Sequence, residues 1–363
     1  MSPKRVLITA GGTGGHLYPA QALGEQIMKE ASASDVLFVA GGLKKNRYFD
    51  NQRFRFEEIA SSPLLSRNPL KCFNGFKNLV KGFRQSIEIL KKYRPDIVVG
   101  FGSYYTIPIL LAAKWLKIPI VLHEANSIPG RANKWCAHLA THVGVHFPST
   151  SSFFKNKGIE VGLPLREGFR LDAMSQEEAL AHYGLSSDRK TLLICGGSQG
   201  ARAINQCIEK CLPTFKRLSL QIIHSTGDLN KAVELEALYA LHQIPACVKA
   251  FEQRMDYAWR AADAFLGRSG ASTIAESIEF EVPGILIPYP YATDQHQEKN
   301  AAFLIDTVKS GCKLLESDLT SELLEKRIEQ LFESSQYLTF KKALKAYKQR
   351  AHQLTLCQLI LKE

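Results

Sequence analysis

Long hydrophobic runs are missing from the sequence. A helix needs about 20 mostly apolar residues to cross a bilayer, and the longest apolar stretch, residues 107–116, is interrupted by Lys114. The first residues pass at once into a strand-like segment, so no secretory signal peptide is predicted. Any contact with a membrane is therefore expected to be peripheral.

Paired cysteines and acidic metal-binding motifs are also missing. None of the eight cysteines forms a C-x-x-C pair, and most lie in apolar segments, which is typical of reduced core residues in the cytosol. No D-x-D-like cluster of carboxylates is present, so we expect no required metal. His138, His142 and His146 are spaced by four, but 141–147 is predicted as a strand, so they would not share a helical face.

The composition is that of an ordinary globular protein with an excess of positive charge. The 363 residues are 45% hydrophobic and 22% charged, and this length favours two domains. Lysine and arginine total 46 against 35 acidic residues, a formal net charge of +11. That charge suits nucleic acid, a diphosphate or an acidic lipid surface, and charge alone does not choose among them.

Short segments rich in valine and isoleucine alternate with helical segments along the whole chain. The main predicted strands are 5–10, 36–40, 97–100, 118–122, 192–195, 221–224, 247–250, 264–266 and 285–288. Near-continuous apolar strands are typical of parallel sheets covered by helices on both faces. We therefore predict an α/β protein with two Rossmann-like domains facing each other across a cleft. The predicted domains are 1–163 and 164–340, with a C-terminal helix at 341–363 that packs back on the first.

Each predicted domain opens with a strand, a glycine cluster and a helix. The clusters lie at 11–16 and 196–201, where free N–H groups and a helix N-terminus can bind phosphate. No Lys-Ser or Lys-Thr follows either cluster, which argues against a Walker A hydrolase. A dinucleotide motif would need glycine at Leu17 and an acidic residue after the second strand, where the chain reads Ala-Gly-Gly at 40–42. Nicotinamide and flavin enzymes are therefore disfavoured.

Three further polar segments follow predicted strands, at 123–126, 268–276 and 294–300. Ligands of such open sheets bind beyond the carboxyl ends of the strands. Glu276 lies one turn into its helix, where a carboxylate can accept hydrogen bonds from a ribose diol.

Together these segments resemble the MurG family, the N-acetylglucosaminyltransferases of peptidoglycan synthesis, which have the GT-B fold. The resemblance covers nearly the whole chain. It is carried by GGTGGH at 11–16, HEAN at 123–126, GGSQGA at 196–201, RSGASTIAE at 268–276 and DQHQEKNA from Asp294. Five motifs in this order, each after a strand, are highly specific.

The resemblance implies an inverting hexosyl transfer. N-acetylglucosamine would pass from its UDP donor to the 4-hydroxyl of undecaprenyl-diphosphate-linked N-acetylmuramyl-pentapeptide (lipid I), giving lipid II through a β-1,4 link. In the family the second domain holds the donor and the first holds the acceptor. The resemblance also implies a peripheral enzyme of cell wall synthesis at the cytoplasmic face of the bacterial inner membrane, with no cofactor and no nucleic acid partner.

The residues matching the family's donor contacts can be named. They are Thr13, Gly14, Gly15, Asn126, Arg166, Ser198, Ala271, Ser272, Thr273, Ile274, Ala275, Glu276 and Gln297. Glu276 would accept hydrogen bonds from the ribose hydroxyls. Ser198 and the N-terminus of the helix behind it would bind the diphosphate. The general base would be His16 or Glu124, and histidine, with an ordinary pKa of about 6.5, is favoured by type.

The chain departs from the family pattern at three places. Ala125 replaces a glutamine near the sugar, Leu163 stands where the family has the asparagine of an Asn-Pro pair before Arg166, and Ser103 replaces a glycine in the acceptor-side loop. None of these changes removes a charged group.

Residues 64–94 combine apolar and basic side chains at helical spacing. The apolar ones are Phe73, Phe76, Leu79, Val80 and Phe83, and the basic ones are Lys71, Lys77, Lys81, Arg84, Lys91 and Lys92. A basic amphipathic helix can lie on an anionic bilayer, but it can also bury its apolar stripe in its own core. The resemblance favours the membrane face.

Two other functions remain open at this point. A UDP-N-acetylglucosamine 2-epimerase has a similar two-domain fold but needs neither a lipid acceptor nor a membrane face. A catalytically silent membrane-docked scaffold would keep the fold without turnover.

Overall fold

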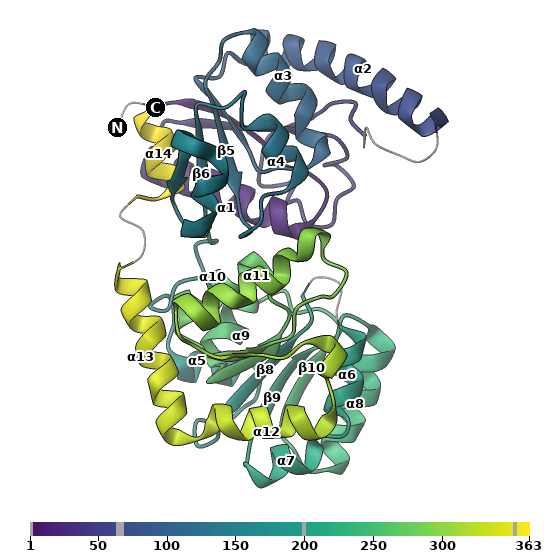
Figure 1. Cartoon of the computed structure of the whole chain (residues 1–363), viewed down its shortest axis with the longest axis vertical. Helices are drawn as coiled ribbons and strands as arrows, with labels where there is room; N and C mark the ends of the chain where they lie inside the picture. The colour runs from purple at the N-terminus through teal and green to yellow at the C-terminus, as the bar shows by residue number, and fades with distance from the viewer. Residues whose placement is uncertain (1–2, 63–68, 198–200, 351–353) are drawn as a thin grey trace. The chain divides into compact units, whose positions relative to one another are not determined.

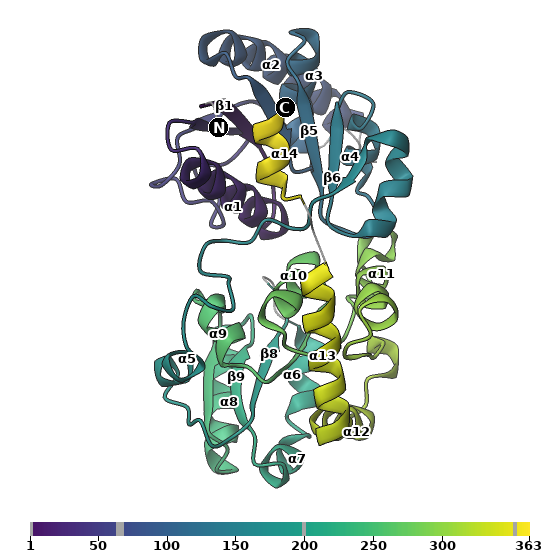
Figure 2. The same cartoon turned by 90° about the vertical axis from the view of Figure 1, so that its left-hand side faces the viewer.

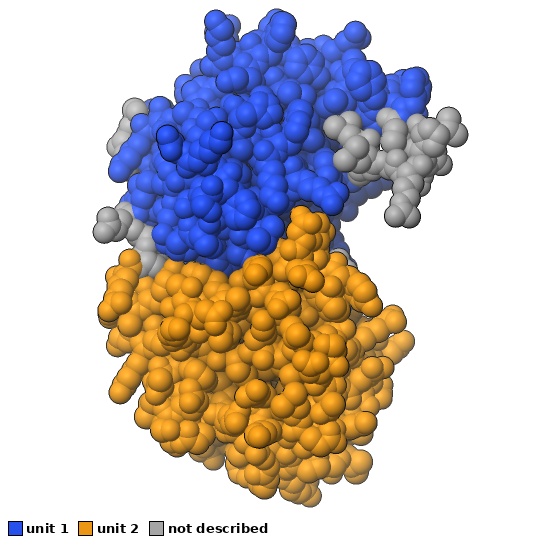
Figure 3. Space-filling model, viewed as in Figure 1, with its two compact units in different colours: residues 1–167, 352–363 blue, residues 168–351 orange. Residues whose placement is uncertain are grey.

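A computed structural model describes residues 3–62, 69–197, 201–350 and 354–363 (Figure 1). Contacts within the chain divide it into two compact units, unit 1 with residues 1–167 and 352–363 and unit 2 with residues 168–351 (Figure 3). The sequence had placed these boundaries after 163 and 340.

Unit 1 is a parallel sheet of seven strands in the order β3-β2-β1-β4-β5-β6-β7. Its strands are β1 (Arg5–Thr9), β2 (Asp35–Ala40), β3 (Phe56–Glu58), β4 (Ile97–Gly100), β5 (Ile120–Glu124), β6 (His142–Val145) and β7 (Gly158–Glu160). Its helices are α1 (Gly14–Glu30), α2 (Pro69–Tyr93), α3 (Ile107–Trp115), α4 (Arg131–Cys136) and α14 (Leu356–Lys362), with 3-10 segments at Tyr104–Thr106 and Pro148–Lys157. The three-residue strands β3 and β7 were not predicted.

The central strands of unit 1 are buried on both faces because their apolar residues alternate between two cores. Val6 and Ile8 of β1 pack in one core with residues of α1 and α14, and Leu7 packs in the other with residues of α2 and α3. Figure 2 shows α14 beside α1. Because helices cover both faces of the sheet, nearly every residue of these strands is apolar.

Unit 2 repeats the arrangement with six parallel strands in the order β10-β9-β8-β11-β12-β13. Its strands are β8 (Thr191–Cys195), β9 (Gln221–Ser225), β10 (Ala246–Lys249), β11 (Ala264–Gly267), β12 (Gly284–Leu286) and β13 (Cys312–Lys313). Its helices are α5 (Gln176–His182), α6 (Arg202–Ile208), α7 (Leu212–Arg217), α8 (Leu229–Leu241), α9 (Met255–Ala261), α10 (Ala271–Phe280), α11 (His296–Ala302), α12 (Ser321–Phe332) and α13 (Ser334–Arg350). The predicted fold class, two Rossmann-like parallel-sheet domains, is confirmed.

The C-terminal segment contains two helices where the sequence predicted one. Helix α13 belongs to unit 2 and α14 to unit 1. Thr355 begins α14 with a capping box, in which its hydroxyl accepts from the backbone N–H of Gln358 (3.1 Å) and the Gln358 amide oxygen accepts from the backbone N–H of Thr355 (3.0 Å). Such reciprocal hydrogen bonds start a new helix.

Candidate functional site

In both units the strand order reverses beside the strand that carries the glycine cluster. β1 pairs with β2 on one side and β4 on the other, and β8 pairs likewise with β9 and β11. The crevice at such a reversal, beyond the carboxyl ends of the strands, is where open parallel sheets bind ligands. The loops after β1, β4 and β5 in unit 1, and after β8, β11 and β12 in unit 2, therefore form the candidate sites.

The first glycine loop leads directly into α1. Gly12 has a φ of +85°, which glycine adopts without steric cost, and its carbonyl accepts a hydrogen bond from the Asn46 side chain (3.1 Å). Thr13 is the N-cap residue of this 17-residue helix, whose first turn carries no acidic side chain. A helix N-terminus of this kind has a partial positive charge and favours an anion.

His16 lies in the first turn of α1, half-buried, beside Thr13. The Thr13 hydroxyl oxygen is 3.4 Å from Nδ1 of the His16 ring, a distance at which a weak hydrogen bond can form. The predicted contacts Thr13, Gly14 and Gly15 and the candidate base His16 are thus brought together by one helix start.

The loop after β4 packs tightly on the glycine loop. A Cβ on Gly11 would lie 2.7 Å from Cβ of Tyr105, so only glycine permits this approach. Ser103, the departure from the family's glycine, has φ +76° and ψ +147°, a region that is costly for any residue except glycine.

Glu124, the second candidate base, is buried, and its carboxylate anchors the loop that follows β5. The carboxylate accepts hydrogen bonds from the backbone N–H groups of Asn126 (2.9 Å) and Gly130 (3.0 Å) and from the Asn133 side chain (2.8 Å). Burial raises the pKa of Glu124, and these donors lower it. Three fixed donors suit a structural carboxylate better than a base that exchanges protons with a substrate.

Two buried residues beside Glu124 complete this anchor. Asn133, which the sequence did not single out, also donates to the His123 carbonyl (2.9 Å). The His123 ring donates from Nε2 to the Gly162 carbonyl (2.9 Å) and packs on Phe101. Burial lowers the pKa of His123 to about 4, so the ring is neutral at pH 7. Asn126, predicted to contact the donor, is therefore held on a rigid loop.

Arg166 lies at the end of unit 1, half-buried and close to the first glycine loop. Its guanidinium carbon is 4.8 Å from the centre of the Tyr18 ring on α1, within the range of a cation–π contact. The structure thus brings Arg166 into the same unit as Thr13, Gly14 and Gly15.

In unit 2, the predicted ribose contact lies on α10. Ala271, Ser272, Thr273, Ile274, Ala275 and Glu276 form the first two turns of this helix, at the carboxyl end of β11. One carboxylate oxygen of Glu276 accepts a hydrogen bond from the indole N–H of Trp259 (2.6 Å), and Trp259 is fully buried. Trp259 orients the carboxylate, and no local sequence pattern points to this role.

Gln297 lies in the first turn of α11, which follows β12 along the chain. Its side-chain oxygen accepts from the backbone N–H of Tyr289 (2.9 Å), and its carbonyl accepts from the Ser269 hydroxyl (2.7 Å). The amide Nε2 makes no hydrogen bond within the described ranges, which suits a donor to a sugar hydroxyl. Arg268 supports the same loop: it donates to the Ile287 carbonyl (3.2 Å) and is paired with Glu316 (2.5 Å).

Ser198 lies outside the described residues. Among the residues that are described, no group of three histidine, cysteine or acidic side chains could hold a metal ion, and His142 is paired instead with Glu363 (2.9 Å).

Two family models match the chain. The glycosyltransferase family 28 N-terminal domain matches residues 6–145, and the glycosyltransferase family 28 C-terminal domain matches residues 191–355.

Curated relatives match over nearly the full length. The UDP-N-acetylglucosamine--N-acetylmuramyl-(pentapeptide) pyrophosphoryl-undecaprenol N-acetylglucosamine transferase of Protochlamydia amoebophila is 55% identical over 99% of this chain and 95% of its own length. The protein with the same name from Chlamydia pneumoniae is 34% identical over 96% and 95%. Among solved structures, Acinetobacter baumannii MurG is 28% identical, with a TM-score of 0.77 over 99% of this chain and all of the other.

Proposed function

The chain belongs to glycosyltransferase family 28, and we propose that it transfers N-acetylglucosamine from its UDP donor to lipid I, giving lipid II for peptidoglycan synthesis. The observation that carries this proposal is the 55% identity, over almost the whole of both chains, to a transferase of that name. The relatives support this activity and not the 2-epimerase or the silent scaffold.

The reaction is a direct displacement. The 4-hydroxyl oxygen of the N-acetylmuramyl residue attacks the anomeric carbon of N-acetylglucosamine, and the bond from that carbon to the diphosphate oxygen breaks. UDP leaves with the electron pair, and the hydroxyl proton passes to a base. The configuration at the anomeric carbon is inverted, which gives the β-1,4 link.

We assign the base to His16 and a structural role to Glu124. His16 is half-buried at the helix start with Nδ1 of its ring 3.4 Å from the Thr13 hydroxyl, whereas Glu124 is buried and accepts hydrogen bonds from Asn126, Gly130 and Asn133. The N-terminus of α1 and the guanidinium of Arg166 stabilise the charge on the leaving diphosphate. In unit 2, Glu276 accepts from the ribose hydroxyls and Gln297 donates to the sugar.

Transfer of radiolabelled N-acetylglucosamine onto a short-chain lipid I analogue tests this function. We expect labelled product in the presence of a chelator, because the N-terminus of α1 and Arg166 are proposed to neutralise the leaving diphosphate in place of a metal. We expect His16→Gln to lower the initial rate of product formation by about 10²–10⁴-fold, the usual contribution of a general base. Protection of the protein by the UDP sugar without any product would refute the transferase and favour the other two functions.

We further propose a peripheral membrane face on unit 1, centred on α2. Helix α2 divides its apolar residues between two environments: Leu79 and Phe83 pack against the core, whereas Phe73 and Phe76 are 69% and 62% exposed. Lys77 and other basic side chains on the same helix are exposed.

Residues 64–68 of the predicted stretch lie outside the described residues. None of the helices within the described ranges has the length and apolar character that spanning a bilayer requires.

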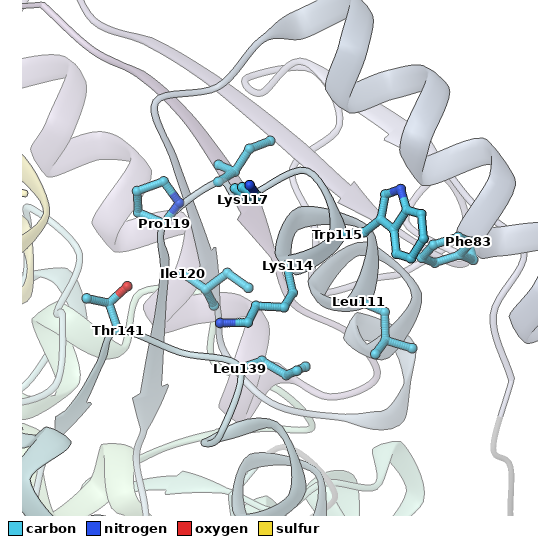
Figure 4. Close-up of a pocket in the computed structure, with 10 residues that line it drawn as sticks. Phe83, Leu111, Lys114, Trp115, Lys117, Pro119, Ile120, Leu139 and Thr141 are labelled. Carbon is cyan, nitrogen blue, oxygen red and sulfur yellow. The ribbon is translucent and has the colours of Figure 1, made fainter.

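An apolar groove adjoins this face. It has a volume of about 820 Å³ and is lined by Phe83, Leu111, Lys114, Trp115, Lys117, Ile118, Pro119, Ile120, Leu139 and Thr141. Trp115 is 75% exposed at its rim beside Phe83, and Lys114 reaches across it (Figure 4). Exposed aromatic rings beside lysines are typical of surfaces that insert into anionic bilayers, where each basic group contributes about 1 kcal/mol.

Co-sedimentation with phosphatidylglycerol vesicles tests the membrane face. We expect the double change Phe73→Ser and Phe76→Ser to lower the partition coefficient at least about tenfold, since burying each ring contributes about 1.5–3 kcal/mol. Leu338→Ser removes a side chain that is 54% exposed on α13 of unit 2 and serves as the control. Equal binding of all three proteins would contradict the assignment.

A further inference from the structure

Segment 165–167 packs against α1, and each of the three residues of the segment contacts the helix. The side-chain amide of Gln26 donates to the Leu165 carbonyl (3.0 Å), and the ammonium of Lys29 is paired with the Glu167 carboxylate (2.5 Å). The backbone N–H of Glu167 also hydrogen-bonds to Glu25. The third residue, Arg166, lies on the ring of Tyr18 (4.8 Å).

These contacts follow one stripe of the helix. Glu25 and Lys29 are seven and eleven residues beyond Tyr18, so at 3.6 residues per turn they lie about 20° to either side of it, and all three fall within about 40°. The carboxylate of Glu25 is further paired with Arg53 (2.6 Å). The segment therefore runs along α1, and Arg166 is held at the end of that stripe nearest the glycine loop.

Tyr18 touches the glycine loop as well as Arg166. Gly14 precedes Tyr18 by one helical turn, and a Cβ on Gly14 would lie 2.9 Å from Cε2 of the ring. The ring also meets Tyr48 edge-on, with centroids 5.8 Å apart at 80°. The absence of a side chain at Gly14 is what lets the ring lie against the loop backbone, and Tyr48 limits its rotation.

We propose that Tyr18 is a positioning residue for donor binding, whose ring holds the Arg166 guanidinium beside the N-terminus of α1 so that both act on one diphosphate. This inference rests on the proposed function, and Tyr18 is not among the residues that match the family's donor contacts. A long arginine side chain loses conformational freedom when it binds an anion, and a preformed stack reduces that loss. Tyr18 acts only through Arg166 and touches no reacting atom.

The test is a double-mutant cycle in the transfer assay with the full chain. Tyr18→Leu keeps an apolar side chain but removes the ring face. We expect it to raise the KM for UDP-N-acetylglucosamine about 3- to 30-fold, the range of a cation–π contact, and to leave the KM for the lipid I analogue within about twofold. Tyr18→Phe keeps the face and should restore the donor KM, since the hydroxyl is not invoked.

The second arm places Tyr18→Leu in an Arg166→Ala background. If the ring acts through Arg166, the tyrosine change should then alter the donor KM by less than about twofold, because coupled residues are not additive. A full additional loss in that background would overturn the proposal, as would an equal rise in both KM values. An enzyme without any transfer activity would refute the proposed function instead.

A second variant keeps the test decisive if Tyr18→Leu fails to fold. Gln26→Leu removes the hydrogen bond to the Leu165 carbonyl and leaves the ring in place. We expect a smaller rise in the donor KM with the acceptor KM unchanged, and a rise that again disappears when Arg166 is alanine. No change in the donor KM for Gln26→Leu would show that anchoring of the segment does not matter for donor binding.

Discussion

Replacing Glu276 by alanine has two separate consequences, one for donor binding and one for stability. A hydrogen bond to a charged group contributes about 1.5–3 kcal/mol, so loss of the ribose contacts should weaken donor binding by about 2–3 kcal/mol. That corresponds to a rise of roughly 30- to 150-fold in the KM for UDP-N-acetylglucosamine. The KM for the acceptor should not change.

The effect on stability comes from Trp259. Its indole N–H donates to Glu276 at 2.6 Å inside the core, and a buried donor left without a partner costs about 1–3 kcal/mol. We therefore expect Glu276→Ala to lower the Tm by about 2–8 °C. Glu276→Gln keeps an oxygen for Trp259, so it should retain most of the stability and still weaken donor binding.

A matched control lies on the same helix. Glu279 is also a carboxylate of α10, but it is paired with Lys348 (2.9 Å). We expect Glu279→Ala to leave both KM values unchanged when initial rates are measured over a range of each substrate. An equal rise in donor and acceptor KM for Glu276→Ala, or the same rise for Glu279→Ala, would refute the ribose assignment.

Three further outcomes follow from unit 1. Ser103→Gly should raise the free energy of unfolding by about 1 kcal/mol, because glycine relieves the cost of φ +76°; an unchanged or lower urea midpoint would contradict this. His123 has a pKa of about 4 when folded and an ordinary pKa near 6.5 when unfolded. Between these two pKa values the unfolded chain therefore binds more protons than the folded one. The free energy of unfolding should fall by up to roughly 3 kcal/mol as the pH drops from about 6.5 to 4. Urea titrations over this pH range should find a smaller fall in His123→Gln. His16→Gln should lower kcat with little change in Tm. Glu124→Gln should instead lower the Tm by several degrees, because the new side-chain NH2 group would face N–H donors that the carboxylate now satisfies.

The strands and glycine loops could be predicted from the sequence because their signals are local. β1 and β8 are apolar runs that each end in a glycine cluster, and the structure places both beside the reversal of strand order. The three-residue strands β3 and β7 were missed because edge strands of that length carry too few residues for a pattern. The start of α14 is marked in the sequence by Thr355 and, three residues later, Gln358, a capping-box pattern that the prediction of a single C-terminal helix did not take into account.

The side chains that support the site could not be predicted in the same way. Asn133 reaches Glu124 across nine residues, and Trp259 reaches Glu276 across seventeen. Neither partner has a distinctive local pattern, and their roles follow only from tertiary packing. The motif identified Glu124 as a polar residue at a strand end and a candidate base, and its burial with three hydrogen-bond donors supports our proposal that it has a structural role instead.

The linkage in the product tests the central claim most directly. The full-length protein is incubated with UDP-N-acetylglucosamine and a soluble lipid I analogue, and the purified product is examined by NMR while released UDP is quantified. The proposed function predicts one UDP per disaccharide and a β link to the 4-position of the N-acetylmuramyl residue. An α link, UDP release without a disaccharide, or an epimerised UDP sugar would contradict it.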